Sequence, residues 1–114
     1  MITIKLINFT KTPGARYTTE GKHSGEQWRD EYLFPQLLNA MELDDLLFVD
    51  LDNTAGIGTG FLEEVFGGLI RIKNIDGNDL LKRLIIKSDD EPEYIDEVCD
   101  YIKDAIRNKN HKHI

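Results

Sequence analysis

The chain has 114 residues, 40% of them hydrophobic, and a net charge of −7 from 21 acidic and 14 basic residues. This length suits a single domain. The acidic charge of the chain makes nucleic acid an unexpected partner. The chain has one cysteine, Cys99, which excludes an intramolecular disulfide or a multi-cysteine zinc site. Because no apolar run approaches the ~18 residues of a membrane span and the first residues do not resemble a signal peptide, we expect a cytoplasmic protein without a membrane segment.

The N-terminal region predicts a β-hairpin. Apolar residues that alternate from Ile2 onward predict a strand over residues 2–9. Pro13-Gly14 is typical of a turn, and residues 16–19 have the composition of a short second strand.

Helical spacing of apolar side chains predicts the next element over residues 25–42. Ser24 and Gln27 resemble a capping box at its start. Pro35 falls inside this pattern, so we expect either a kink there or a break between two shorter helices.

A strand, a glycine-rich loop and a helix follow in the middle of the chain. The continuous apolar run over residues 46–49 predicts a strand buried on both faces. The loop covers residues 52–60, and apolar periodicity predicts a helix over 60–71. Gly67-Gly68 lies inside this helix, which indicates that another element approaches its backbone closely.

The C-terminal region predicts a short helix over 79–84, a strand over 84–87 and a helix over 92–108. Strands that alternate with helices indicate an α/β domain with one sheet and helices packed on it, here spanning residues 1–108 before a flexible tail at 109–114. We expect Leu47, Val49 and Ile86 to be buried in central strands. The last helix should dock through Ile95, Val98, Cys99 and Ile102.

Asp50-Leu51-Asp52-Asn53-Thr54 supports two interpretations. A D-x-D-x-T string after a strand is similar to that of haloacid-dehalogenase-type phosphatases, in which one Asp attacks phosphorus, the other transfers protons and Mg²⁺ screens the charge. Lys87, Asp89 and Asp90, after another apolar strand, would supply the remaining charged groups. In the alternative interpretation Asp50 and Asp52 accept hydrogen bonds from loop amides and end the strand.

Gly56-Ile57-Gly58-Thr59-Gly60 joins a predicted strand to a predicted helix. It is not a P-loop, because no Lys-Ser/Thr pair follows, and it lacks the third glycine of G-x-G-x-x-G. Exposed amides at a helix start form a generic anion site, so a small-ligand or nucleotide-binding domain is one alternative. The other is a tight structural turn in which Thr59 is the N-cap.

Four segments together resemble one known family. They are Thr12-Pro13-Gly14-Ala15-Arg16-Tyr17, Ser24-Gly25-Glu26-Gln27-Trp28-Arg29, Phe48-Val49-Asp50-Leu51-Asp52, and Gly58-Thr59-Gly60-Phe61-Leu62-Glu63-Glu64-Val65-Phe66-Gly67-Gly68-Leu69. They resemble the STAS-like domains of unknown function, the DUF4325 family, over residues 2–106.

This resemblance implies a fold similar to anti-sigma-factor antagonists, with helices packed on a mixed sheet, and a role in bacterial-type signalling. In STAS domains the strand-to-helix turn carries a phosphorylatable Ser or Thr, which a histidine-kinase-like ATPase recognises. Thr59 occupies that position here, although the usual Asp-Ser-Ser-Gly is replaced by Gly58-Thr59-Gly60-Phe61. The resemblance therefore implies a non-enzymatic interaction module that needs no cofactor and no metal. Its expected partner-binding residues are Arg16, Arg29, Gly56, Gly58, Thr59, Gly60 and Glu63.

Overall fold

The computed structural model describes residues 1–111 and contains one three-stranded sheet with the order β1-β2-β3. The strands are β1 (Ile2–Lys5), β2 (Leu47–Asp50) and β3 (Leu84–Lys87). Both pairs are parallel, and Ile4, Val49 and Ile86 lie side by side in the register. The predicted α/β class is confirmed, but the described sheet is parallel throughout rather than mixed.

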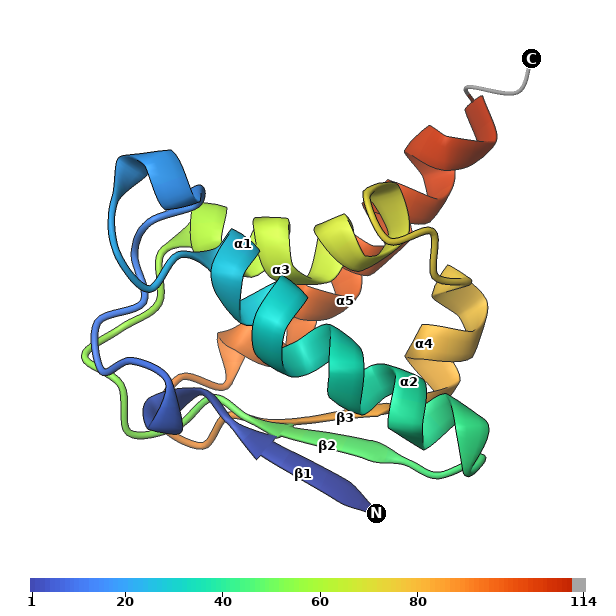
Figure 1. Ribbon diagram of the computed structural model, residues 1–114, viewed down its shortest axis with the longest axis horizontal. Coiled ribbons are helices and arrows are strands. Elements are labelled where there is room, and N and C mark those ends of the chain that lie inside the picture. Colours follow the sequence, from blue (N-terminus) through green and yellow to red (C-terminus); the bar gives the residue numbers. More distant parts are fainter. Residues whose placement is uncertain (112–114) are drawn as a thin grey trace.

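All the α-helices lie over the same face of this sheet (Figure 1). Parallel neighbours need crossover connections, and these are almost always right-handed. Because both crossovers step in the same direction across the sheet, their helices share one face. The helices are α1 (Gly25–Trp28), α2 (Phe34–Glu42), α3 (Thr59–Arg71), α4 (Gly77–Arg83) and α5 (Glu93–His111).

Only one face of β2 is covered, so the prediction of a strand buried on both faces is wrong. Leu47 and Val49 are fully buried against the helices, as predicted. Phe48 on the opposite face is half-buried, and its neighbour Ile85 on β3 is 37% exposed. Ile86 is only partly buried, because β3 is an edge strand rather than a central one.

The predicted N-terminal hairpin is absent. The first strand ends at Lys5, and short 3₁₀-helices form at η1 (Leu6–Asn8) and η2 (Thr18–Glu20). In the second segment the Glu20 carboxylate accepts a hydrogen bond from the Tyr17 amide at 2.8 Å, and Glu26 accepts one from the Thr18 amide at 3.0 Å. These local acceptors satisfy the backbone groups that a strand would have needed a neighbour to satisfy.

Pro35 neither breaks the predicted helix nor forms a simple kink. Between α1 and α2 lies one π-helical stretch, η3 (Arg29–Leu33), so the chain remains helical from Gly25 to Glu42. Proline has no amide to donate, and the wider turn lets the Phe34 amide bond to the Arg29 carbonyl instead. The π-helical turn, with its i→i−5 hydrogen bond, therefore accommodates the proline without ending the helix.

The C-terminal helix α5 packs on α3 and is longer than predicted. Val98 and Ile102 are fully buried, as expected, but Cys99 is only half-buried and Ile95 is 38% exposed. The helix continues to His111, so residues 109–111 of the predicted tail are helical, and the rest of that tail lies outside the described residues. Among residues 1–111 no helix is both long and apolar enough to cross a bilayer.

Candidate interaction site at the start of α3

The glycine-rich loop before α3 is held in place by hydrogen bonds to distant parts of the chain. Ala55 donates its amide to the Lys11 carbonyl at 2.8 Å, and Gly58 donates to Pro13 at 2.9 Å. The Ile57 amide donates to the Tyr94 hydroxyl of α5 at 2.9 Å. The loop is therefore a fixed shape on the surface, built where the segment over 11–14 and the first turn of α5 meet it.

Each of the three glycines in the loop and the first turn of α3 has its own structural reason. Gly56 has a φ of 122°, in a region that only glycine adopts readily. A Cβ on Gly58 would lie 3.1 Å from the Gly14 carbonyl oxygen. A Cβ on Gly60 would lie 3.2 Å from Nε of Arg16. The structure thus brings Arg16 against the start of α3, as the predicted site requires.

Thr59 is the first residue of α3 rather than its predicted N-cap. Gly58 occupies the N-cap position, and no side chain accepts a hydrogen bond there. Thr59 is exposed, so its hydroxyl is free of the capping role that the sequence suggested. The first amides of α3 face the same surface, where the positive end of the helix dipole favours negative charge.

Beside this turn lies a cluster of five charged side chains that joins η3, α3 and the segment before η2. We call it the arginine–glutamate cluster, and its members are Arg16, Arg29, Glu63, Glu64 and Arg71. It contains three positive and two negative groups, and Asp30 and Lys73, which extend it from Arg29, add one of each. The cluster therefore adds no net negative charge next to Thr59.

The buried half of the cluster is the pair formed by Arg29 and Glu64. The Arg29 guanidinium donates to a carboxylate oxygen of Glu64 at 2.5 Å and to its backbone carbonyl at 3.0 Å. Arg29 is 2% exposed and Glu64 3%. The prediction that Arg29 contacts a partner directly is therefore wrong, because its guanidinium is enclosed between η3 and α3. It lies over Gly68, where a Cβ would overlap it, which confirms the predicted close approach of another element at Gly68. At Gly67 the nearest side chains belong to α3 itself, so the prediction fails there.

The exposed half of the cluster links Arg16 and Arg71 through Glu63. Arg16 lies 2.6 Å from one oxygen of Glu63, and Arg71 lies 2.8 Å from the other. Burial opposes ionisation of Glu63, but the hydrogen bonds from Arg71 and Arg16 outweigh it and lower the pKa of this carboxyl. Sequence patterning did not identify Glu64 or Arg71. One sequence signal did point to a buried ion pair. Arg29 falls among the buried residues of its helix, and a buried arginine needs a buried acidic partner.

Asp50 and Asp52 make the loop hydrogen bonds of the structural interpretation. The Asp50 carboxylate accepts from the Asp52 amide at 2.9 Å. Asp52 is 4% exposed, accepts from the Asp90 amide at 2.9 Å and is paired with Lys87. The Asp90 amide, followed by Lys87, holds the pKa of the Asp52 carboxyl below its usual value. Both oxygens of Asp52 are thus engaged in fixing the loop.

The pocket next to the loop is small. It has a volume of about 100 Å³ between the loop at Thr54–Gly56 and the start of α5, whereas ligand pockets typically measure about 300–1,000 Å³. Within the described residues, no group of three or more His, Cys, Asp or Glu side chains is arranged to hold a metal ion. This pocket is therefore smaller than those that typically enclose a small ligand.

A parallel α/β domain with a strand-to-helix turn on its surface is consistent with a STAS-like class of protein. A model of the family described as STAS-like domain of unknown function (DUF4325) matches residues 31–94, more than half of the chain. The chain belongs to this family. No curated protein and no solved structure matches it.

Proposed function

We propose that this protein is a non-enzymatic regulatory module that binds a protein partner through residues 54–60 and the first turn of α3. The observation that carries the proposal is the exposed Thr59, placed at the helix start by a loop whose backbone is hydrogen-bonded on both sides. A fixed loop loses little conformational entropy when it binds, which favours recognition. Its resemblance to STAS domains makes a histidine-kinase-like ATPase the expected partner.

The proposal extends to Thr59 as the residue at which phosphorylation switches the interaction. A phosphate at the first position of α3 would lie near amides that have no intrahelical acceptor and at the positive end of the dipole. Glu63 and Glu64, one turn along, would repel it if they were unpaired. They are paired with Arg16, Arg29 and Arg71, so the local repulsion is weaker than the sequence suggests.

The test begins with affinity capture from the native host and continues with the purified partner. Wild-type protein, Thr59→Ala and Thr59→Glu are compared by isothermal titration, and Thr19→Glu is the matched control because Thr19 is also exposed but lies in η2. We expect Thr59→Glu to change the dissociation constant about tenfold or more, equivalent to about 1.4 kcal/mol, and Thr19→Glu to leave it unchanged. Equal affinities for all four folded proteins would place the interaction elsewhere.

The absence of enzymatic activity is tested separately. We expect no hydrolysis of p-nitrophenyl phosphate or acetyl phosphate in the presence of Mg²⁺, because Asp52 is held by Lys87 and the Asp90 amide. Asp50→Asn is measured alongside. Turnover by the wild-type protein that this substitution abolishes would instead establish the phosphohydrolase.

A further inference from the structure

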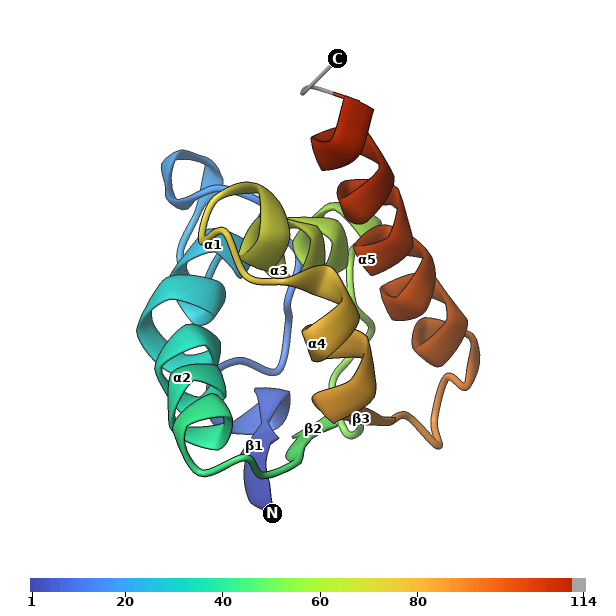
Figure 2. The same ribbon diagram turned by 90° about the vertical axis from the view of Figure 1, so that its right-hand side faces the viewer.

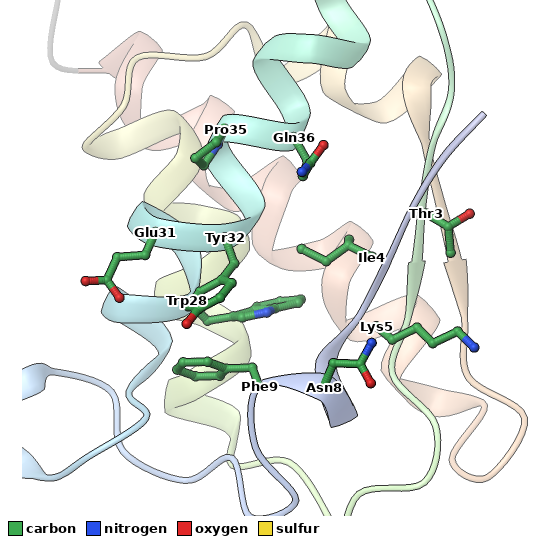
Figure 3. Close-up of a pocket in the computed structure, with 10 residues that line it drawn as sticks. All are labelled: Thr3, Ile4, Lys5, Asn8, Phe9, Trp28, Glu31, Tyr32, Pro35 and Gln36. Carbon is green, nitrogen blue, oxygen red and sulfur yellow. The ribbon is translucent and has the colours of Figure 1, made fainter.

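A groove runs along the free edge of β1, on the side of the domain away from β2 (Figure 3). Its volume is about 380 Å³, within the ~300–1,000 Å³ range of ligand pockets. Thr3, Ile4 and Lys5 form one wall, and the aromatic rings of Trp28 and Tyr32 lie opposite. Phe9 closes one end, with its ring centroid 5.0 Å from that of Tyr32.

The strand wall of this groove presents unpaired backbone groups. The Ile2 amide donates to the Leu46 carbonyl, which shows that Ile2 points its backbone groups toward β2. In a parallel ladder alternate residues point to opposite neighbours, so Thr3 points its amide and carbonyl, and Lys5 its amide, into the groove. The Lys5 carbonyl, at the N-cap of η1, accepts the first hydrogen bond of that helix. The two Thr3 groups and the Lys5 amide can be satisfied by a fourth strand, as in peptide recognition by strand addition.

The position of α2 determines what kind of strand fits. Seen along the sheet, α2 lies outside β1, over the place that a fourth strand would occupy (Figure 2). A second copy that paired through its own β1 would bring its α2 over the same place. Packed helices need about 8–10 Å between axes, whereas paired strands are about 4.8 Å apart. A single extended segment without a helix of its own meets no such conflict.

The side chains around the groove define the chemistry of the segment. Ile4 points toward the helix, whereas Thr3 and Lys5 point to the open face of the sheet (Figure 3). Lys5 lies beside Asp50 and Asp50 beside Lys87 in the register, and among residues 1–111 Lys5 makes no side-chain ion pair. A carboxylate on an added strand, opposite Lys5, would continue this alternation of charge.

We propose that the free edge of β1 binds an extended acidic segment of a partner protein as a fourth strand of the sheet. Backbone hydrogen bonds to Thr3 and Lys5 supply the pairing. An apolar side chain opposite Ile4 enters the groove beneath Trp28 and Tyr32, and an Asp or Glu next to it in sequence lies beside Lys5. This surface is separate from the loop at Thr59, so a partner can occupy both.

The probe is a library of random eight-residue peptides displayed on phage and selected on the immobilised wild-type protein. Enriched sequences are synthesised, and their affinities are measured by fluorescence polarisation. We expect them to alternate apolar with polar residues and to carry Asp or Glu next to an apolar position. We expect Lys5→Glu to weaken their binding at least fivefold. Failure to enrich any peptide, or enrichment of peptides without this pattern, would overturn the proposal.

Two further variants separate the backbone from the groove wall. Thr3→Pro removes one edge amide, which an edge strand tolerates, and Thr3→Val is its matched control because it keeps the amide. Tyr32→Ala removes the aromatic wall without touching β1. We expect Thr3→Pro and Tyr32→Ala each to weaken binding at least tenfold and Thr3→Val to preserve it. Unchanged affinity in the first two variants overturns the proposal, as does a wild-type dimer in sedimentation equilibrium that Thr3→Pro dissociates.

Discussion

Arg29 and Glu64 form a buried ion pair that connects two helices 35 residues apart in sequence. Removal of one member of such a pair leaves an uncompensated buried charge and typically costs about 3–5 kcal/mol, whereas replacement of both by apolar residues is often neutral. Arg29 keeps its 2.8 Å contact with the partly exposed Asp30, so we expect Glu64→Leu to lower the free energy of unfolding by an amount at the lower end of this range, about 3 kcal/mol. The double variant Arg29→Met/Glu64→Leu should recover most of this loss.

Urea unfolding measures both effects. Asp104→Ala is the control, because Asp104 pairs with Arg107 at a site where the two side chains are 58% and 65% exposed. Exposed pairs contribute at most about 1 kcal/mol. If Glu64→Leu cost no more than this control, the cluster would not be a determinant of stability.

Asp52 gives the stability of the protein a predictable dependence on pH. The pKa of its carboxyl is lowered in the folded state, chiefly by the Asp90 amide and then by Lys87. Its contribution is therefore fully present above the unfolded pKa of about 3.9 and is lost as the pH falls through the lower folded value. We expect Asp52→Asn to destabilise the protein by about 1.5–3 kcal/mol at pH 7, and this difference to shrink below about pH 4.

Urea titrations at pH 7, 5 and 3 test this dependence on pH. Asp89→Asn is the matched control, since Asp89 contacts the same lysine at 3.0 Å but is 79% exposed. It should change stability little at any of these values. A deficit in Asp52→Asn that stayed the same from pH 7 to pH 3 would show that its ionisation is not the cause.

The docking of α5 on α3 depends on one row of side chains. Ile102 is fully buried at this contact, whereas Ile95, two turns earlier, is 38% exposed. We expect Ile102→Ala to cost about 2–5 kcal/mol through lost transfer energy and the cavity left behind. Ile95→Ala should cost less than about 1 kcal/mol. Thermal or urea unfolding compares them, and equal losses would mean that the contact between α5 and α3 is not centred on Ile102.

Helices were easier to predict from this sequence than the N-terminal strand and turns. The apolar periodicity over residues 60–71 and 92–108 determined both long helices, because their buried stripes are continuous. Residues 16–19 have strand-like composition, but the carboxylates of Glu20 and Glu26 satisfy their backbone locally. The π-helical stretch before Pro35 was equally hidden, since a pattern shows that a proline must be accommodated but not by which turn.

The candidate site was only partly predictable for a related reason. The glycine turn and Thr59 are contiguous in sequence, so a local pattern was enough to identify them. The pairing of Arg29 with Glu64 depends on the crossing of two helices, and hydrophobic periodicity carries no information about which charges meet across such a contact. The open face of the sheet was missed because the apolar run at 46–49 is the same whether one face or both are covered.

Across the whole molecule, burial and backbone hydrogen bonding predict an order of amide hydrogen-exchange rates. We expect the slowest amides in β2, which pairs on both sides, and in the middle of α3, where residues are buried. The fastest should lie at residues 22–23, which are exposed and follow the end of η2. Although the loop over 54–58 has no regular structure, the Ala55, Ile57 and Gly58 amides should exchange at intermediate rates because each is hydrogen-bonded.

Amide exchange followed by NMR resolves these residues individually, and Tyr94→Phe provides the matched variant. The Ile57 amide donates a hydrogen bond to the Tyr94 hydroxyl, so loss of this hydroxyl should accelerate exchange at Ile57. The Gly58 amide, which donates to the Pro13 carbonyl, should be less affected. If the loop exchanged as fast as residues 22–23 in the wild-type protein, it would open freely on this timescale. Binding at Thr59 would then have to pay the entropy of ordering the loop, and the proposal of a preformed docking surface would fail while the fold itself stood.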